Sequence, residues 1–120
     1  MGAPETDSGV ETLLSAVMQS VGSHDTRLRE RGADDVTDLC GALSESQVRR
    51  LAQLLVRVRL AEQDLQCQES QLNALCVLQC AHGLSDELLA PLHALWGAGL
   101  EPSQVEYLEA LLYASAPARR

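Results

Sequence analysis

The chain is built around residues 72–81, Leu72-Asn73-Ala74-Leu75-Cys76-Val77-Leu78-Gln79-Cys80-Ala81, of which eight are apolar. They leave no wide polar face at the period of either a helix or a strand. A helix that is apolar nearly all round is packed by neighbours on several sides, and the run is too short for a bilayer, which needs about 20 residues. It therefore predicts the central, buried helix of a helical domain.

Composition extends this prediction to all 120 residues of the chain. Ile and Phe are absent and Thr is rare, whereas Leu, Ala, Gln, Glu and Arg, which favour helices, are abundant. A chain of this length forms one domain. We therefore expect an all-α fold of five to six helices, with antiparallel helical hairpins packed as a compact bundle or as a short stack.

Local signals place several helix boundaries. Capping boxes at Ser8–Glu11 and Ser44–Gln47 predict the starts of two helices, and Pro102 suits the first position of the last one. Ser23–Gly32 is interpreted as a loop with one helical turn, and a further helix is expected from about Ala33.

The central helix is expected at about Glu69–Ala81, after a polar connection that includes Gln66–Ser70. Ser85 can cap the next helix, which Pro91 should kink or confine to a few turns. The chain is thus predicted to have a flexible lead (residues 1–7), one helical domain (residues 8–113) and a loose tail (residues 114–120).

Charge is distributed unevenly along the chain. The formal net charge of −8 disfavours binding to nucleic acid and to anionic membranes. Between Leu60 and Ala118 there is no basic residue, but there are eight acids: Glu62, Asp64, Glu69, Asp86, Glu87, Glu101, Glu106 and Glu109. One interpretation is a solvated surface that keeps the protein soluble. The other is an anionic face that steers a cationic protein partner, with these eight residues as candidate partner-binding residues.

The basic residues are all arginines. Arg50 and Arg57 share one face of their predicted helix, and Arg49 follows Glu45 by one helical turn. Pairing with the acidic half of the chain is one interpretation of these arginines. A small cationic contact site is the other.

Residues capable of catalysis or metal binding form no recognisable pattern. Cys76 and Cys80 lie one turn apart in the apolar run, with Cys67 and His82 nearby, whereas zinc sites pair cysteines on turns. We expect Cys76 and Cys80 to be buried thiols without metal; zinc binding and a redox role are the alternatives. The histidines are scattered, and no nucleophile stands beside a base. The sequence predicts no enzyme activity, cofactor or metal.

The first residues show no pattern typical of a targeting signal. Residues 1–7 lack the basic and apolar regions of a signal peptide, and no run is long enough to span a membrane. We therefore expect a cytoplasmic protein whose cysteines stay reduced.

A family resemblance covers roughly residues 43–113 and rests on Glu69–Leu75, Leu84–Leu95 and Glu106–Leu112. These segments resemble small helical, HEAT-like proteins of GC-rich bacteria, among them immunity proteins encoded beside polymorphic toxins. The resemblance implies a short HEAT-like stack whose acidic surface binds and blocks a basic toxin domain. Unequal helix lengths depart from true HEAT repeats. The alternative function is a helical adaptor or scaffold subunit of a larger complex that uses an apolar groove.

Overall fold

The computed structural model describes residues 3–113, and the side chains of residues 9–113. This part of the chain has no strand and forms six α-helices and two 3-10 helices. The α-helices are α1 (Ala3–Val21), α2 (Thr26–Leu39), α3 (Glu45–Ala61), α4 (Leu65–His82), α5 (Asp86–Leu89) and α6 (Pro102–Tyr113). The 3-10 helices are η1 (Cys40–Ala42) and η2 (Ala90–Gly97). The predicted all-α fold of five to six helices is confirmed.

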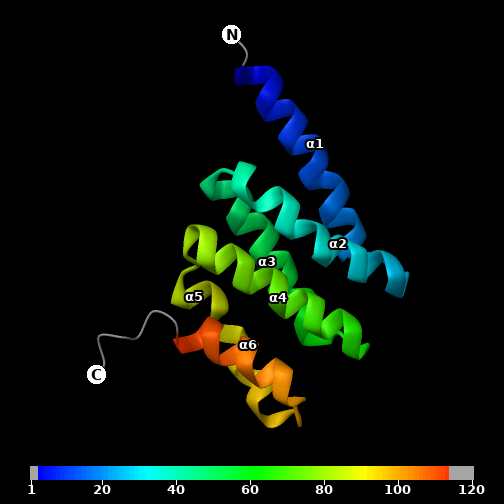
Figure 1. Ribbon diagram of the computed structural model, residues 1–120, viewed down its shortest axis with the longest axis vertical. Coiled ribbons are helices and arrows are strands. Elements are labelled where there is room, and N and C mark those ends of the chain that lie inside the picture. The colour runs from blue at the N-terminus through cyan, green and yellow to red at the C-terminus, as the bar shows by residue number, and fades with distance from the viewer. Residues whose placement is uncertain (1–2, 114–120) are drawn as a thin grey trace.

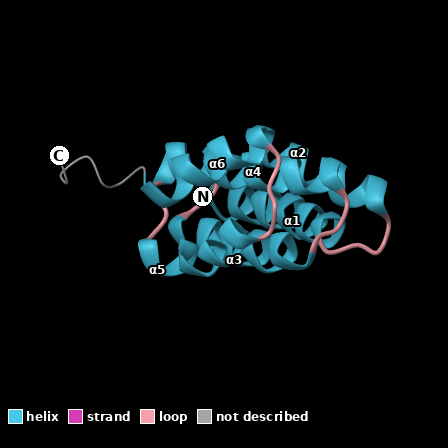
Figure 2. Ribbon diagram, turned by 90° about the horizontal axis from the view of Figure 1, so that it is seen from below, coloured by secondary structure: helices cyan, strands magenta, loops and turns pink. Residues whose placement is uncertain are grey.

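The helices form three antiparallel hairpins that stand side by side (Figure 1). Figure 2 shows two layers, with α2, α4 and α6 in one and α1, α3 and α5 in the other. The shortest dimension of the molecule is 19 Å, which is about two helix diameters of roughly 10 Å each. In the described residues, no helix has the length and hydropathy needed to cross a membrane.

The central helix is α4, as the apolar run predicts. It contacts α2 and α6 in its own layer and α3 in the other layer, so side chains on most of its circumference meet other helices. Leu72, Leu75 and Leu78 are completely buried. These leucines form the middle of a core that α1, α2, α3, α5, η2 and α6 complete.

Two helices begin earlier than predicted because aspartates cap them. The Asp25 carboxylate accepts hydrogen bonds from the Arg27 amide at 2.9 Å and the Leu28 amide at 3.3 Å, so α2 begins inside the segment expected to be a loop. The Asp64 carboxylate accepts from the Cys67 amide at 3.0 Å. The predicted polar connection at residues 66–70 is therefore the first part of α4.

The start of α1 is also earlier than predicted. The helix begins at Ala3, so the expected capping box at Ser8–Glu11 lies inside it. Glu11 reaches α3 instead, where its carboxylate accepts hydrogen bonds from Arg50 Nη2 at 2.9 Å and Gln47 Nε2 at 3.0 Å. A carboxylate expected to serve its own helix start thus ties α1 to α3.

The other local signals are confirmed. Ser44 and Gln47 form the predicted capping box at the start of α3, with bonds of 3.2 and 2.8 Å. Ser85 caps α5 by accepting from the Leu88 amide. Pro91 confines α5 to four residues, and the chain continues as η2, because proline cannot donate the hydrogen bond that a longer α-helix requires.

Gly32 allows α1 and α2 to pack closely. It is buried within α2, and a Cβ at this position would lie 2.7 Å from Ser20 Cβ and 2.8 Å from the Val21 amide nitrogen. These distances are shorter than van der Waals contact, so the approach of the two helices requires a residue without a side chain.

We predict that Gly32→Ala destabilises the protein by about 1–3 kcal/mol, because the two helices must move apart. This cost exceeds the helix propensity that alanine adds, about 1 kcal/mol. Gly9→Ala is the matched control, since Gly9 lies in α1 and a methyl group there would meet no atom within 4 Å; it should be neutral or mildly stabilising. Urea denaturation measures both variants, and equal effects would contradict the close-packing interpretation.

Candidate functional site

The eight acids predicted to form one binding face occupy different environments. Glu62, at the end of α3, is buried, with only 8% of its surface exposed. Its carboxylate accepts two hydrogen bonds from the Arg29 guanidinium, at 2.8 and 2.9 Å, and one from Gln71 Nε2 at 2.8 Å. Glu62 is therefore a structural ion-pair partner of α2, and its assignment to an exposed acidic face is wrong.

The protonation state of Glu62 follows from these contacts. Burial by itself would raise the pKa of its carboxyl, but hydrogen bonds from Arg29, Gln71 and the Asp64 amide outweigh it and lower the pKa to about 2. Glu62 is thus a fixed negative charge inside the fold, neutralised by Arg29.

A buried arginine, Arg59, extends this polar network across the layers. Arg59 is almost completely buried in α3, and its Nη2 donates to Gln104 Oε1 of α6 at 2.7 Å. Gln104 in turn donates to Gln68 of α4, and Gln68 donates to the Glu62 carbonyl oxygen. The network joins α2, α3, α4 and α6, which indicates a structural role rather than a reactive one.

Two further acids, Asp64 and Glu69, accept hydrogen bonds that serve the fold. Asp64 caps α4, as described above. Glu69, near the start of α4, accepts a hydrogen bond from the Ser103 hydroxyl and so joins α4 to α6. Ser103 lies one turn before Glu106 on α6, and Glu106 lies one turn before Glu109.

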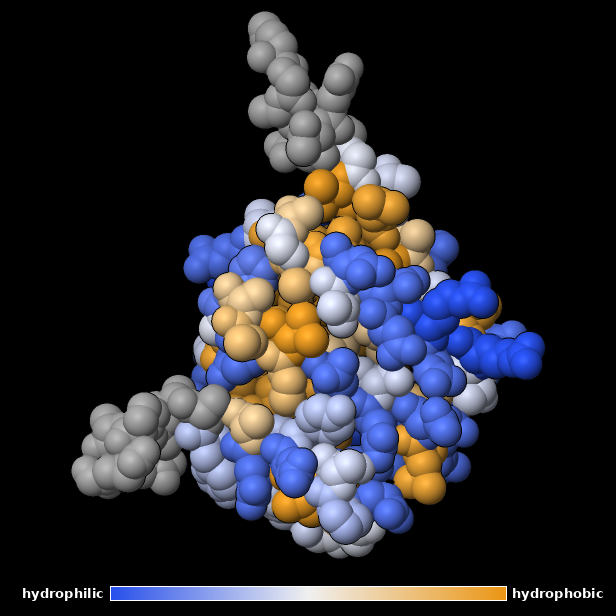
Figure 3. All heavy atoms as spheres, viewed as in Figure 1, coloured by the Kyte–Doolittle hydropathy of each residue, from blue (hydrophilic) through white to orange (hydrophobic). Residues whose placement is uncertain are grey.

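The remaining five acids are exposed, but they do not lie together: Asp86, Glu87, Glu101, Glu106 and Glu109. Asp86 and Glu87 belong to α5 in one layer, whereas Glu106 and Glu109 lie on α6 in the other. Figure 3 shows the face made by α2, α4 and α6, where hydrophilic side chains alternate with apolar ones. We call Glu69, Glu106 and Glu109 the acidic strip; it is what remains of the predicted face at the α4–α6 edge.

The arginines do not pair with the acidic half in the way the sequence indicates. Arg29 pairs with Glu62, but Arg50 pairs with Glu11 of α1. Among the residues that the structure describes, Arg49 and Arg57 form no ion pair. Both are exposed on α3, so this helix has two charges available to a partner.

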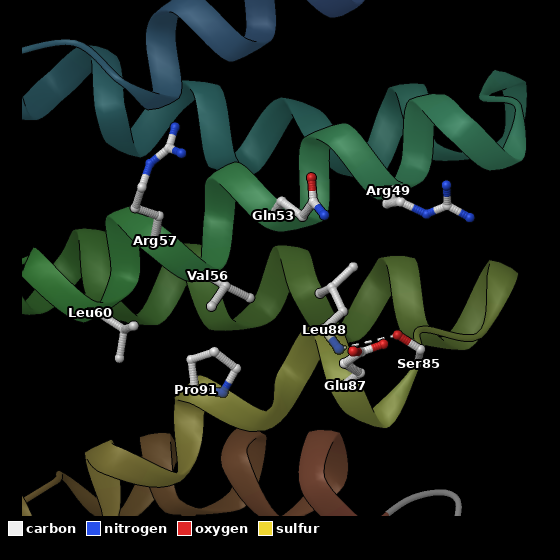
Figure 4. Close-up of a pocket in the computed structure, with 9 residues that line it drawn as sticks. All are labelled: Arg49, Gln53, Val56, Arg57, Leu60, Ser85, Glu87, Leu88 and Pro91. Atoms are coloured by element: carbon white, nitrogen blue, oxygen red, sulfur yellow. Dashed lines mark hydrogen bonds between the residues drawn. The ribbon is translucent and has the colours of Figure 1, made fainter.

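These two arginines lie along the α3 side of a groove between α3 and α5, and the Arg57 side chain points away from α5 (Figure 4). The groove has a volume of about 620 Å³ and is lined by Arg49, Gln53, Val56, Arg57, Leu60, Ser85, Glu87, Leu88 and Pro91. Val56 and Leu60 point from α3 toward Pro91, and Leu88 points from α5 toward α3. We call this feature the α3–α5 groove. Its position was not predicted from the sequence, although the spacing of its α3 residues, at intervals of three and four, marks one helix face.

The thiols are poorly suited to nucleophilic chemistry. Cys67 is buried, and burial raises the pKa of its thiol to about 12. Burial also raises the pKa of the Cys76 thiol, to about 11, and thiolates are the reactive form. Cys76 is half-buried and Cys80 is exposed at the end of α4, so neither thiol is fully buried as predicted, and the prediction is wrong for Cys80.

Metal-binding side chains do not converge in the described part of the chain. No group of three or more His, Cys, Asp or Glu residues there could hold a metal ion. His82 has a structural contact, because its Nε2 lies 2.7 Å from the Cys40 carbonyl oxygen and ties the end of α4 to η1.

No protein-family model, curated protein or solved structure matches this chain.

Proposed function

We propose that the protein is a non-catalytic protein-binding domain of the immunity type, which binds a cationic protein partner through the acidic strip. The observation that carries this proposal is the exposure of Glu106 and Glu109 on the outer side of α6, with no ion-pair partner in the described chain. α6 is an edge helix of the stack, so a partner could approach it from outside.

The charge distribution supports the same proposal. Beyond Arg59, which is buried, the described chain has no Arg or Lys side chain. Glu106 and Glu109 repel each other slightly at their spacing, and a cationic surface would relieve that repulsion. Clustered charge of one sign raises the association rate with a partner of the opposite sign.

The test is a double charge reversal, Glu106→Arg with Glu109→Arg, assayed against a basic toxin domain wherever a neighbouring gene encodes one. We expect association to slow by roughly tenfold or more at low salt and the difference to shrink as salt rises. Thermal stability should change little, because exposed charges contribute little to folding. Stopped-flow mixing measures the rate.

The matched control is Asp34→Arg with Asp38→Arg, since these two acids are exposed one turn apart on α2. It changes the net charge equally but lies outside the acidic strip. Equal slowing by both double variants would show a general charge effect, and no slowing by the α6 variant would contradict the proposed surface.

A second candidate function is a helical adaptor that binds a partner in an apolar groove. The observation that favours it is the α3–α5 groove, where Leu60 is 41% exposed and Leu88 and Pro91 face it.

A further inference from the structure

The α3–α5 groove lies where the short α5 is followed by η2, and apolar side chains form its floor. Pro91 ends α5 after four residues and the chain continues as η2, a tighter helix than an α-helix. Both α5 and η2 contact α3, and beside these contacts Leu60 and Pro91 border an open groove.

The dimensions of the groove match a short helix. Its α3 wall runs from Arg49 to Leu60, which is about 16 Å at 1.5 Å per residue. This length corresponds to about three turns of a partner helix. An amphipathic helix laid into an apolar groove is a recurring mode of peptide recognition.

The charges on the two walls define the chemistry of that helix. Arg49 and Arg57 have no ion pair in the described chain and lie about 12 Å apart along α3, although the whole chain carries a net charge of −8. Carboxylates about two turns apart on a partner helix would match them. Glu87 on the α5 wall would repel a polyanion such as nucleic acid, and the apolar floor offers such a ligand nothing.

We propose that the α3–α5 groove binds a short amphipathic helix of a partner protein, whose apolar face covers Leu60, Leu88 and Pro91 and whose carboxylates pair with Arg49 and Arg57. A basic residue on the opposite edge of that helix would face Glu87 and fix its direction. This inference rests on the second candidate function and is independent of the acidic strip.

The experiment uses the full chain and a synthetic probe. The probe is a fluorescein-labelled amphipathic peptide of about four turns, with leucines on one face and two glutamates seven residues apart on its edge. A second peptide has arginines in place of the glutamates. Fluorescence anisotropy should show binding of the acidic peptide and binding weaker by about tenfold or more for the basic one.

Substitutions on α3 test whether the peptide binds in the α3–α5 groove. Arg49→Glu with Arg57→Glu should weaken binding of the acidic peptide by about tenfold or more. The matched control, Arg27→Glu with Arg31→Glu, alters two exposed arginines of α2 by the same charge and should change binding by less than about twofold. Leu60→Ser should weaken binding without changing the preference for the acidic peptide. Circular dichroism checks that each variant remains helical.

Four results would overturn the proposal. The first two are equal weakening of peptide binding by the two arginine double variants and equal binding of the acidic and basic peptides. The others are tighter binding of a single-stranded oligonucleotide than of the acidic peptide, and no binding at peptide concentrations of about 1 mM. Glu106→Arg with Glu109→Arg should change the affinity for the acidic peptide by less than about twofold. The test of the groove is therefore independent of the test of the acidic strip.

Discussion

Leu75→Ala is expected to lower the free energy of unfolding by about 2–5 kcal/mol. Leu75 is 0% exposed on α4, and α4 contacts helices on three sides. Truncation removes buried methyl groups and leaves a cavity, which the surrounding helices cannot close without disturbing their other contacts. Urea denaturation monitored by circular dichroism measures the change.

Leu65→Ala is the control for this prediction. Leu65 is the first residue of the same helix but is 56% exposed, so its truncation should cost less than about 1 kcal/mol. A loss for Leu75→Ala no larger than that for Leu65→Ala would mean that α4 is not the centre of the core.

The fold could be predicted from the sequence where the signals are local. The Ser44–Gln47 capping box, the Ser85 cap, Pro91 and Pro102 act on residues within one turn of themselves, and each has its predicted consequence. The apolar run at residues 72–81 likewise reports burial directly, because almost every face of that helix is apolar.

The predictions from sequence are wrong where a residue's partner is distant along the chain. The polar segment at the start of α2 forms a helix partly because Arg29 forms an ion pair with Glu62, and no residue near Arg29 in the sequence indicates that pair. Gly32 resembles a helix breaker in isolation, but it provides the space that α1 requires. Asp25 and Asp64 are hard to recognise as caps because the segments that follow them are mostly polar and show no clear apolar stripe.

The candidate surfaces show the same limit. Acid content alone places Glu62 on the predicted face, yet Glu62 and Arg29 neutralise each other inside the fold. The α3–α5 groove depends on how α5 sits beside α3, and this arrangement appears only in the assembled layers. Sequence therefore predicts which residue types are in excess, and the structure determines which of them are accessible.

The Arg29–Glu62 pair is expected to make stability depend strongly on pH. The pKa of Glu62 is lowered from 4.5 to about 2 in the folded protein. The folded state therefore binds fewer protons than the unfolded state between these values, so stability must fall as the pH falls. The contribution is fully present above about pH 4.5 and is lost as the pH passes through about 2. It amounts to about 2 kcal/mol lost by pH 3 and about 3 kcal/mol by pH 2.

Other carboxyls titrate in the same range, so the test is a comparison between variants. Glu62→Gln removes the titrating group and leaves Arg29 without its charge partner, so it should be less stable than the wild type at pH 7 by about 3 kcal/mol or more. Its stability should then fall less steeply than that of the wild type between about pH 5 and pH 2. Glu109→Gln, a change at an exposed acid, should follow the wild type throughout. Parallel pH profiles for the wild type and Glu62→Gln, measured by urea denaturation, would show that the buried pair does not carry this stability, and the structural role assigned to Glu62 would have to be given up.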